Sequence, residues 1–267
     1  MLTNCRLVAV DMDGTFLTDK KEYDRQHFAE LYKKMQARNI QFVVASGNQY
    51  YQLESFFSEY PETIYIADNG ANIRKKNAKY FGSHFVREKA DQILRLLEYY
   101  KGLNDELVVS GFSSAYILPN RNEKFMQAAR FYNRHLQIVD SFSEIKEEIT
   151  KYSFNYYPKR DGEFMWHMQG RLAGLGEITT SGHGNFDIIQ PGVHKASGLK
   201  YLSQKLNIPL NQMCAFGDGG NDLEMLRAVG DGVAMSNAAP EVKRVADHLT
   251  GTNNDQGVLR YIERLVN

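Results

Sequence analysis

Short apolar runs rich in β-branched residues recur along this chain, and each ends in a small polar or acidic cluster. Each run spans only four or five residues, which suits a strand and is too short for a buried helix. Uninterrupted apolar runs of this length are typical of strands buried on both faces of a parallel sheet. The runs that follow this pattern are Arg6–Val10, Gln41–Ala45, Ile64–Ala67, Met213–Phe216 and Gly232–Met235.

Amphipathic stretches with helical spacing separate these predicted strands. From about Asp24, Phe28, Leu31, Tyr32 and Met35 recur three or four positions apart and form one apolar face. Similar patterns cover residues 196–206, 221–228, a stretch from Pro240 and the C-terminal segment. Strands that alternate with helices in this way predict an α/β fold, a Rossmann-like doubly wound parallel sheet.

The pattern changes between residues 83 and 187. Helical patterns at about 89–100, 123–135 and 162–173 lie among strand-like pieces at 106–110, 115–118, 152–157, 177–180 and 186–190. No apolar run in this region ends in acids as Arg6–Val10 does. We therefore predict an inserted α+β cap domain over residues 83–187, between a first core segment (1–82) and a second (188–267).

Charge and composition narrow the function classes. The chain has 267 residues with 32 Lys and Arg against 32 Asp and Glu, so its formal net charge is zero. This balance argues against a nucleic-acid-binding protein, which normally carries a basic excess. The N-terminus offers no secretory signal, and no apolar run approaches the length of a membrane span. We expect a cytoplasmic protein that does not associate with membranes and needs no obligate protein partner.

Polar side chains gather where the predicted core strands end. Asp11, Asp13, Ser46, Asp218 and Asp222 all follow such strands. Ligands of open α/β sheets bind at the carboxyl ends of the strands, so these residues are expected to converge. Converging carboxylates repel one another unless a cation joins them, and hard oxygen ligands suit Mg²⁺.

Four motifs in order resemble those of the haloacid-dehalogenase-like phosphatases. They are Asp11-Met-Asp-Gly-Thr15, the strand end Ser46-Gly47, Lys195, and Gly217-Asp-Gly-Gly-Asn-Asp222. The first alone is moderately specific, whereas all four in order are highly specific. A cap between the second and third motifs resembles the Cof-type subgroup, and Val44–Leu53 is similar to bacterial sugar-phosphate phosphatases of that subgroup. The resemblance covers the whole chain.

This resemblance implies catalytic roles for two aspartates. Asp11 would be the nucleophile that forms an aspartyl phosphate. Asp13 would protonate the leaving oxygen and then activate water. The implied cofactor is Mg²⁺, with Asp11, the backbone carbonyl of Asp13, Asp218 and Asp222 at the metal site. Asp222 is either a direct ligand or a carboxylate that orients waters and Lys195.

The resemblance also implies a phosphate-binding set: Ser46, Gly47, Lys195 and Asn221. One departure concerns the second motif, which is Thr-Gly-Arg in the common pattern of the subgroup and Ser46-Gly47-Asn48 here. The hydroxyl is retained and the arginine is lost. Any substrate role of that arginine is therefore in doubt, but the phosphate contact is not.

Several other residues have two interpretations. In the cap, His183, Asn185 and Asp187 either contact the substrate or belong to a polar, Gly-rich turn. Tyr50 and Tyr51 form a wall of the pocket or pack in the core. Asn69 and Gly70 line the site or only form a turn.

The predicted function is a Mg²⁺-dependent phosphatase of small phosphorylated metabolites, with sugar phosphates as the first choice. The alternatives are a phosphomutase or other phosphotransferase of the same superfamily, or a non-catalytic protein that binds phosphorylated metabolites. Release of free phosphate separates the first alternative from a phosphatase. Intact Asp11 and Asp13 argue against the second.

Overall fold

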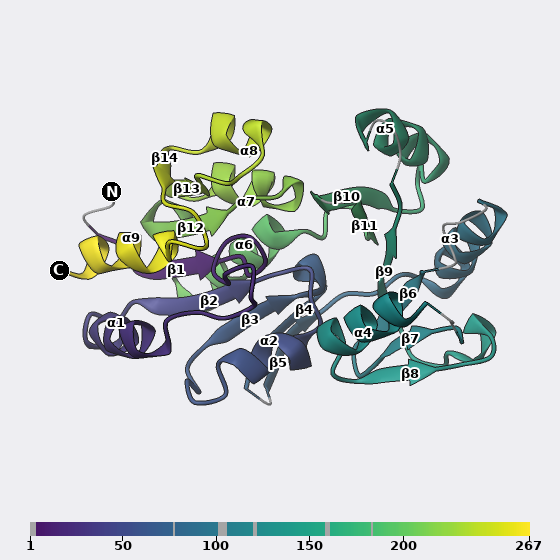
Figure 1. The fold of residues 1–267 in the computed structure, drawn as a ribbon, viewed down its shortest axis with the longest axis horizontal. Coiled ribbons are helices and arrows are strands. Elements are labelled where there is room, and N and C mark those ends of the chain that lie inside the picture. Colours follow the sequence, from purple (N-terminus) through teal and green to yellow (C-terminus); the bar gives the residue numbers. More distant parts are fainter. Residues whose placement is uncertain (1–3, 77, 101–105, 120–121, 158–160, 183) are drawn as a thin grey trace.

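Two β-sheets lie side by side in the computed structural model of the protein (Figure 1). The structure describes residues 4–76, 78–100, 106–119, 122–157, 161–182 and 184–267. The larger sheet has eight strands, and both chain termini lie at its end of the molecule, away from the smaller six-stranded sheet. Among the described helices, none is both long and apolar enough to cross a lipid bilayer.

The larger sheet has the strand order β14-β13-β12-β1-β2-β3-β4-β5 and is parallel from β14 to β3. Its strands are β1 (Leu7–Val10), β2 (Gln41–Ala45), β3 (Ile64–Ala67), β4 (Asn72–Lys75), β5 (Ala78–Gly82), β12 (Met213–Gly217), β13 (Asp231–Met235) and β14 (His248–Thr250). The chain proceeds from β1 toward β3 on one side and from β12 toward β14 on the other. The switch point of this doubly wound sheet therefore lies between β1 and β12, where the Asp11 and Asp218 loops are neighbours.

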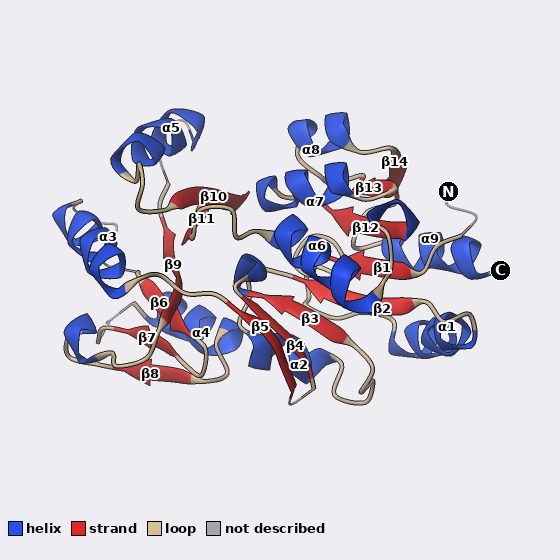
Figure 2. Ribbon diagram, turned by 180° about the vertical axis from the view of Figure 1, so that it is seen from behind, coloured by secondary structure: helices blue, strands red, loops and turns tan. Residues whose placement is uncertain are grey.

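Helices cover both faces of this sheet. They are α1 (Arg25–Ala37), α2 (Tyr50–Phe56), α6 (Lys195–Leu206), α7 (Leu223–Ala228), α8 (Pro240–Val245) and α9 (Gly257–Val266). Right-handed crossovers place α1, which packs against α9, on one face and α6, which packs against α7, on the other. Figure 2 shows α6 in front of the sheet. The predicted α/β fold with a doubly wound core is confirmed.

Helix α1 shows how local sequence builds this layer. Asp24 accepts a hydrogen bond from the backbone N–H of His27 at 2.9 Å, which satisfies one of the free N–H groups at the helix start. The predicted apolar face, made of Phe28, Leu31, Tyr32 and Met35, is buried in the main core.

The smaller sheet has the strand order β10-β11-β9-β6-β7-β8 and is antiparallel except between β7 and β8. Its strands are β6 (Val108–Gly111), β7 (Ala115–Ile117), β8 (Leu136–Ile138), β9 (Ile149–Asn155), β10 (Glu177–Gly182) and β11 (Asn185–Ile189). Its helices are α3 (Arg87–Tyr99), α4 (Glu123–Tyr132) and α5 (Asp161–Arg171). The inserted α+β character is confirmed. Strand β11 continues two residues past the predicted end of the insert, and the domain boundaries themselves stay a prediction.

The two faces of the smaller sheet differ in chemistry. On β9, Tyr152 and Phe154 join an apolar cluster that includes Ile93 of α3 and Met168 of α5. Alternate residues point the other way. The polar side chains on this second face are Lys151, Ser153 and Asn155 of β9 with Asn185 and Asp187 of β11, and we call this set the polar row.

Among the described elements, one α-helix and four strands are absent from the sequence prediction: α2, β4, β5, β8 and β14. The hairpin sequence Asn72–Gly82 is largely polar and alternates poorly, and it pairs at the edge of the sheet rather than in its buried centre. Helix α2 has seven residues and no side-chain cap at its start. These elements form because neighbouring strands give them a surface to pair with or to pack on, which local sequence does not encode.

Candidate active site

The loops that follow β1, β2 and β12 meet at one cavity between the two sheets. Its volume is about 400 Å³, and predicted site residues from these loops line it: Asp11, Asp13, Ser46, Gly47, Asp218 and Asn221. The cavity is also lined by the polar row and by residues of α4. Lys195 and Asp222 lie directly behind this lining and are fully buried.

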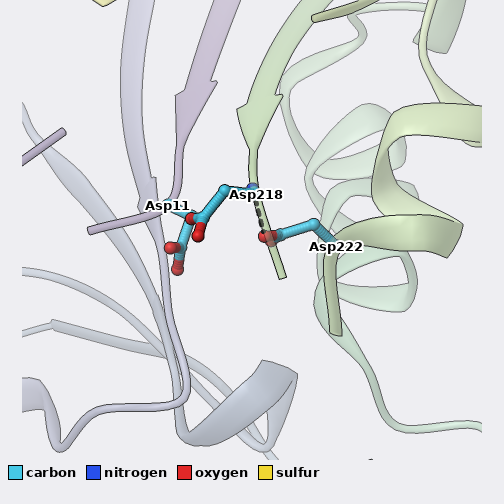
Figure 3. A group of neighbouring side chains, drawn as sticks. All are labelled: Asp11, Asp218 and Asp222. Atoms are coloured by element: carbon cyan, nitrogen blue, oxygen red, sulfur yellow. Dashed lines mark hydrogen bonds between the residues drawn. The ribbon is translucent and has the colours of Figure 1, made fainter. Parts of the chain in front are cut away.

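Three carboxylates converge at the switch point of the sheet. Asp11, Asp218 and Asp222 each offer an oxygen atom, and these three atoms lie within 4.8 Å of one another. Figure 3 shows the carboxylates of Asp11 and Asp218 turned toward each other from the ends of β1 and β12. Such a set of oxygen ligands fits a small hard cation such as Mg²⁺.

The electrostatics of this cluster support a cation. Burial, together with the neighbouring charges of Asp222 and Asp218, raises the pKa of Asp11 well above its ordinary value, although Lys195 opposes the shift. Burial and Asp222 likewise raise the pKa of Asp218 to about 7. Carboxyl groups held together in this way resist ionisation until positive charge is supplied. The cluster could therefore hold a metal ion.

Gly14 allows the first and fourth motifs to approach each other. Its φ is +75°, and a β-carbon there would lie 2.4 Å from Oδ2 of Asp218. The next residue, Thr15, donates from its hydroxyl to Oδ1 of Asp218 at 2.6 Å. The glycine of the first motif is therefore required both by the backbone conformation and by space for the carboxylate.

Lys195 is a fully buried cation held between two acids. Its Nζ donates to Oδ1 of Asp11 and to Oδ1 of Asp222, both at 2.6 Å. Burial alone would lower the pKa of Lys195, but the charges of Asp11 and Asp222 outweigh it and raise that pKa. The lysine is therefore charged at the point where a phosphoryl group would meet Asp11.

Both oxygens of Asp222 accept hydrogen bonds from the protein itself. Oδ1 accepts from Lys195, and Oδ2 accepts hydrogen bonds from the backbone N–H groups of Asp218 and Gly219, each at 3.0 Å. Figure 3 shows the bond from Asp218 as a dashed line. These bonds fix the shape of the fourth motif. Of the two roles considered for Asp222, this arrangement favours the one in which it orients Lys195 and the loop.

Asp13 has three partners that the sequence did not reveal. Nζ of Lys21 lies 2.5 Å from Oδ1, and the amide of Asn48 donates to Oδ2 at 2.8 Å. The hydroxyl of Tyr132, on α4 of the smaller sheet, lies 3.5 Å from the same Oδ1. Asn48, which stands where the common pattern has arginine, thus contacts the second aspartate.

Lys21 and Tyr132 carry no motif that would have singled them out. Lys21 belongs to a polar pair with Lys20, and Tyr132 is the last residue of an amphipathic helix. Their contacts with Asp13 depend on the three-dimensional arrangement of the loop after β1 and of helix α4, which a local sequence pattern does not show.

A buried chain of polar contacts links the fourth motif to the cap. The amide of Asn221 donates to Oδ1 of Asn69 at 3.1 Å, and the amide of Asn69 donates to Oδ2 of Asp187 at 2.6 Å. Oδ1 of Asp187 accepts from the Ser153 hydroxyl at 2.5 Å and from Lys151 Nζ at 3.1 Å. Asn69 is therefore more than a turn residue, although it lies behind the cavity lining.

The remaining candidates, three from the cap and two from α2, have different outcomes. Asn185 and Asp187 line the cavity, and His183 lies outside the described residues. Tyr50 and Tyr51 are not among the described lining residues. Tyr50 is buried in the core, so the packing interpretation holds for it, while Tyr51 stacks on His135 with ring centroids 3.7 Å apart.

His135 also joins the cap to the core through its backbone. The amide of Gln49 donates to the carbonyl of His135 at 3.2 Å, and the N–H of His135 donates to Oε1 of Gln49 at 3.1 Å. Gln49 and Tyr51 lie at the start of α2, and His135 lies between α4 and β8. We call this contact the α2 junction.

The family of the chain follows from a comparison with known families. A family model described as haloacid dehalogenase-like hydrolase matches residues 8–262. The chain belongs to this family. The match confirms the resemblance that the four motifs indicate.

Bacterial proteins that are similar to this hydrolase carry phosphatase names. An Escherichia coli (strain K12) protein named 5-amino-6-(5-phospho-D-ribitylamino)uracil phosphatase is 38% identical over 266 residues, covering 98% of this chain and 96% of that protein. A Bacillus subtilis (strain 168) phosphatase is 28% identical over 287 residues, covering 98% of this chain and all of that protein, 100%. The crystal structure of SMU.1108c from Streptococcus mutans UA159 superposes with a TM-score of 0.90 at 32% identity, covering 97% and 98% of the two chains.

Proposed function

We propose that this haloacid dehalogenase-like hydrolase is a Mg²⁺-dependent phosphatase that releases phosphate from small phosphorylated metabolites through an aspartyl phosphate on Asp11. One observation carries the proposal. Three groups meet at one end of the cavity: the buried cation Lys195, the candidate nucleophile Asp11 and the acid Asp13, which has its own partner in Lys21. The phosphatase names of the relatives support the same reaction class.

In the first step, Asp11 attacks phosphorus. Lys195 engages Oδ1 of Asp11, so Oδ2 is the proposed attacking atom. A bond forms from this oxygen to phosphorus while the phosphorus–oxygen bond to the leaving group breaks. Asp13 donates a proton to the departing oxygen, which leaves as an alcohol.

In the second step, Asp13 acts as a base. Its carboxylate takes a proton from water, and the resulting hydroxide oxygen attacks the phosphorus of the aspartyl phosphate. Inorganic phosphate leaves and the Asp11 carboxylate is restored. Lys21 and Asn48 each hold one oxygen of Asp13, which fixes the orientation that both transfers need.

The phosphoryl oxygens would be bound by Ser46, the backbone at Gly47, Asn221 and Lys195. Asp11, Asp218 and the backbone carbonyl of Asp13 would hold Mg²⁺, with Asp222 orienting the loop behind them. A bound Mg²⁺ supplies positive charge that neutralises the phosphoryl oxygens and the clustered carboxylates.

The leaving group would lie against the polar row of the cap. Lys151 and Ser153 offer donors and Asp187 offers acceptors, a combination that suits the hydroxyl groups of a sugar or sugar alcohol. The phosphorylated ribityl chain in the name of the Escherichia coli relative supports this preference. We propose phosphate esters of sugars or sugar alcohols as the substrate class.

The test is phosphate release by the purified protein from p-nitrophenyl phosphate and a panel of sugar phosphates, with and without Mg²⁺. Asp11→Asn should abolish turnover because the amide is nearly isosteric but is not a nucleophile. Asp91→Asn, on the exposed side of α3, is the matched control. Normal turnover by Asp11→Asn would refute the aspartyl-phosphate mechanism, and phosphoryl transfer to a sugar without free phosphate would favour a phosphomutase.

A further inference from the structure

We propose that the cap end of the cavity is a subsite for a planar, nitrogen-bearing ring on the substrate, and that Glu106 accepts hydrogen bonds from the N–H groups of that ring. The inference rests on the proposed function for the phosphate end of the cavity. It adds a second recognition element, at a part of the lining that phosphate and sugar binding do not use. Three features of the cavity support this inference: an apolar wall, an acceptor with fixed orientation, and the polar row between them and the proposed catalytic acids.

The apolar wall comes from β6 and α4. Val108, Phe125 and Ala129 belong to a small apolar cluster on the cavity side of the smaller sheet, and all three line the cavity together with Ala128. A sugar placed here would bury hydroxyl groups without partners, at a cost of roughly 1–3 kcal/mol each. A flat ring with apolar faces has no hydrogen bonds to water on those faces, so it loses none when it packs against this wall.

Glu106 provides the acceptor beside this wall. It lies just before β6 and lines the cavity. Its Oε1 accepts from the amide of Asn122 at 2.6 Å, and its Oε2 accepts from the amide of Asn155 at 3.0 Å. An ionised carboxylate has about four acceptor sites, so these two bonds hold the group in place and leave acceptor capacity facing the cavity.

The neighbouring amides are oriented toward Glu106. Ser181 donates to Oδ1 of Asn185 at 3.2 Å, Asn185 donates to Oδ1 of Asn155 at 3.3 Å, and Asn155 donates to Glu106. In all three hydrogen bonds the donor lies on the Ser181 side and the acceptor on the Glu106 side. The last acceptor is the carboxylate of Glu106, which can only accept. The ligand group that meets Glu106 must therefore be a donor, such as the amino or imino edge of a heterocycle.

The polar row connects the two ends of the site. On β9, Ser153 lies between Lys151 and Asn155, and it donates to Asp187, which is bonded to Asn69 of the core. A sugar or sugar-alcohol chain would lie along this row, with its phosphate at Asp11 and its ring at Glu106 and Phe125. A cavity of about 400 Å³ lies within the range of roughly 300–1,000 Å³ that is usual for such composite ligands.

The test compares esters that share one phosphate and one pentose. Ribose 5-phosphate lacks a ring of this kind, while cytidine and guanosine 5′-monophosphates carry a small and a larger one. With Mg²⁺ present, we expect kcat/KM to be at least about tenfold higher for one of the nucleotides than for ribose 5-phosphate, because the ring is held by a bond that ribose 5-phosphate lacks.

Two substitutions assign the effect to named residues. Glu106→Gln should lower kcat/KM for the better nucleotide by about tenfold, since one amide donor would then face another. Phe125→Leu keeps an apolar side chain but removes the flat ring, and should lower it several-fold. Both variants should leave ribose 5-phosphate unchanged. Glu98→Gln, exposed on α3, is the matched control.

The possible results separate this inference from the proposed function. Equal turnover of all three esters would overturn the ring subsite and leave the phosphatase standing. Equal losses by Glu106→Gln on every ester would assign Glu106 to cap folding and overturn its recognition role. No phosphate from any ester or from p-nitrophenyl phosphate would refute the phosphatase. In that case, calorimetry of the same three esters still decides, since equal affinities would overturn the subsite.

Discussion

Lys195 and its two acids set the charge balance of the site. The lysine neutralises one negative charge of a cluster that contains Asp11, Asp218 and Asp222, all buried or half-buried. The remaining negative charge is costly in a poorly solvated site unless a cation or protons compensate it. This balance makes the binding of Mg²⁺ and the stability of the fold interdependent.

We predict that Mg²⁺ raises the melting temperature of the protein and that Asp218→Asn removes most of this rise. A cation at 100 times its dissociation constant stabilises the native state by about 2.7 kcal/mol. The measurement is thermal unfolding in chelator and in excess Mg²⁺, with Asp91→Asn as the control. Phosphate release should be lost in chelator and restored by Mg²⁺. An unchanged melting temperature in the wild type would contradict a metal site at this cluster.

Lys21 is predicted to act as a positioning residue for Asp13. Lys21→Met should lower kcat by about tenfold, a part of the 10²–10⁴-fold that general acid–base catalysis supplies, while KM for a sugar phosphate changes little. Burial lowers the pKa of Lys21, but Asp13 outweighs this effect and raises that pKa, so the lysine is a charged partner. The matched control is Lys20→Met, an exposed neighbour. A similar loss in both variants would show that the effect is not due to the Asp13 contact.

Asp68 is an acid whose environment disfavours its charge. It is buried, has a φ of 51°, and neither carboxyl oxygen has a hydrogen-bond partner among the residues that the structure describes. Burial raises its pKa to about 7, against the opposing charge of Lys151. The folded state therefore retains a proton that the unfolded chain releases near its ordinary pKa of 3.8. The stability contribution of Asp68 consequently falls as pH rises from about 4 to about 7.

The resulting prediction is that Asp68→Asn stabilises the protein at about pH 8 and does so much less at about pH 5. Between pH 5 and pH 8 this stabilisation should change by at most about 2.7 kcal/mol, since the interval from pH 5 to a pKa of about 7 spans about two units at 1.36 kcal/mol each. Urea unfolding of both proteins at both pH values measures it. A difference that stays constant with pH would mean that Asp68 is ionised in the folded protein.

Among the elements, the strands with continuous apolar runs were predictable and the contacts between elements were not. Strands β1, β2, β3 and β12 are identified by their composition, and the motifs at their ends converge because parallel strands end at one edge. Hairpin β4–β5 escaped prediction because it is largely polar and is paired only at an edge.

The polar contacts with the cap could not be predicted for a different reason. Asn69 and Asp187 are 118 positions apart in the sequence, and Gln49 and His135 are 86 apart. Such pairs depend on how the smaller sheet is oriented over the larger one, and a local pattern holds no information about that orientation.

The α2 junction should couple the cap to the core. Tyr51→Ala and His135→Ala should each destabilise the protein, and the double variant should lose less than the sum of the two. Stacked aromatic pairs contribute about 0.5–1.5 kcal/mol beyond their buried area, which sets the expected coupling energy. A double-mutant cycle in urea unfolding measures it. Additive losses would mean that the stacking at the α2 junction carries no energy.

For the molecule as a whole, we propose that the groups that react with the phosphate and the groups that select the substrate lie in different parts of the chain. The four motifs lie on the larger sheet, whereas the polar row, Glu106 and Phe125 lie on the smaller one. In the proposed mechanism, the leaving group lies against the cap, while the attacking carboxylate of Asp11 comes from the larger sheet.

Exchanging the segment 83–190 for that of a relative should therefore change substrate preference and retain turnover of p-nitrophenyl phosphate. The end point follows β11, which terminates at Ile189. Relative kcat/KM values across the ester panel give the result. The same order of preference after the exchange would mean that selectivity resides in the core, at Asn48 or Gln49.

The strand order of the larger sheet also has a consequence for biosynthesis. Strand β1 lies between β2 and β12, so its second neighbour is made only after the whole smaller sheet has been translated. Each strand of the smaller sheet finds its partners within residues 108–189. On a ribosome, the cap can therefore complete its sheet while β1 to β3 still expose one apolar edge. At this stage of synthesis, β1 has no partner strand on the side that later pairs with β12. That edge of the sheet is closed only when β12 has been made.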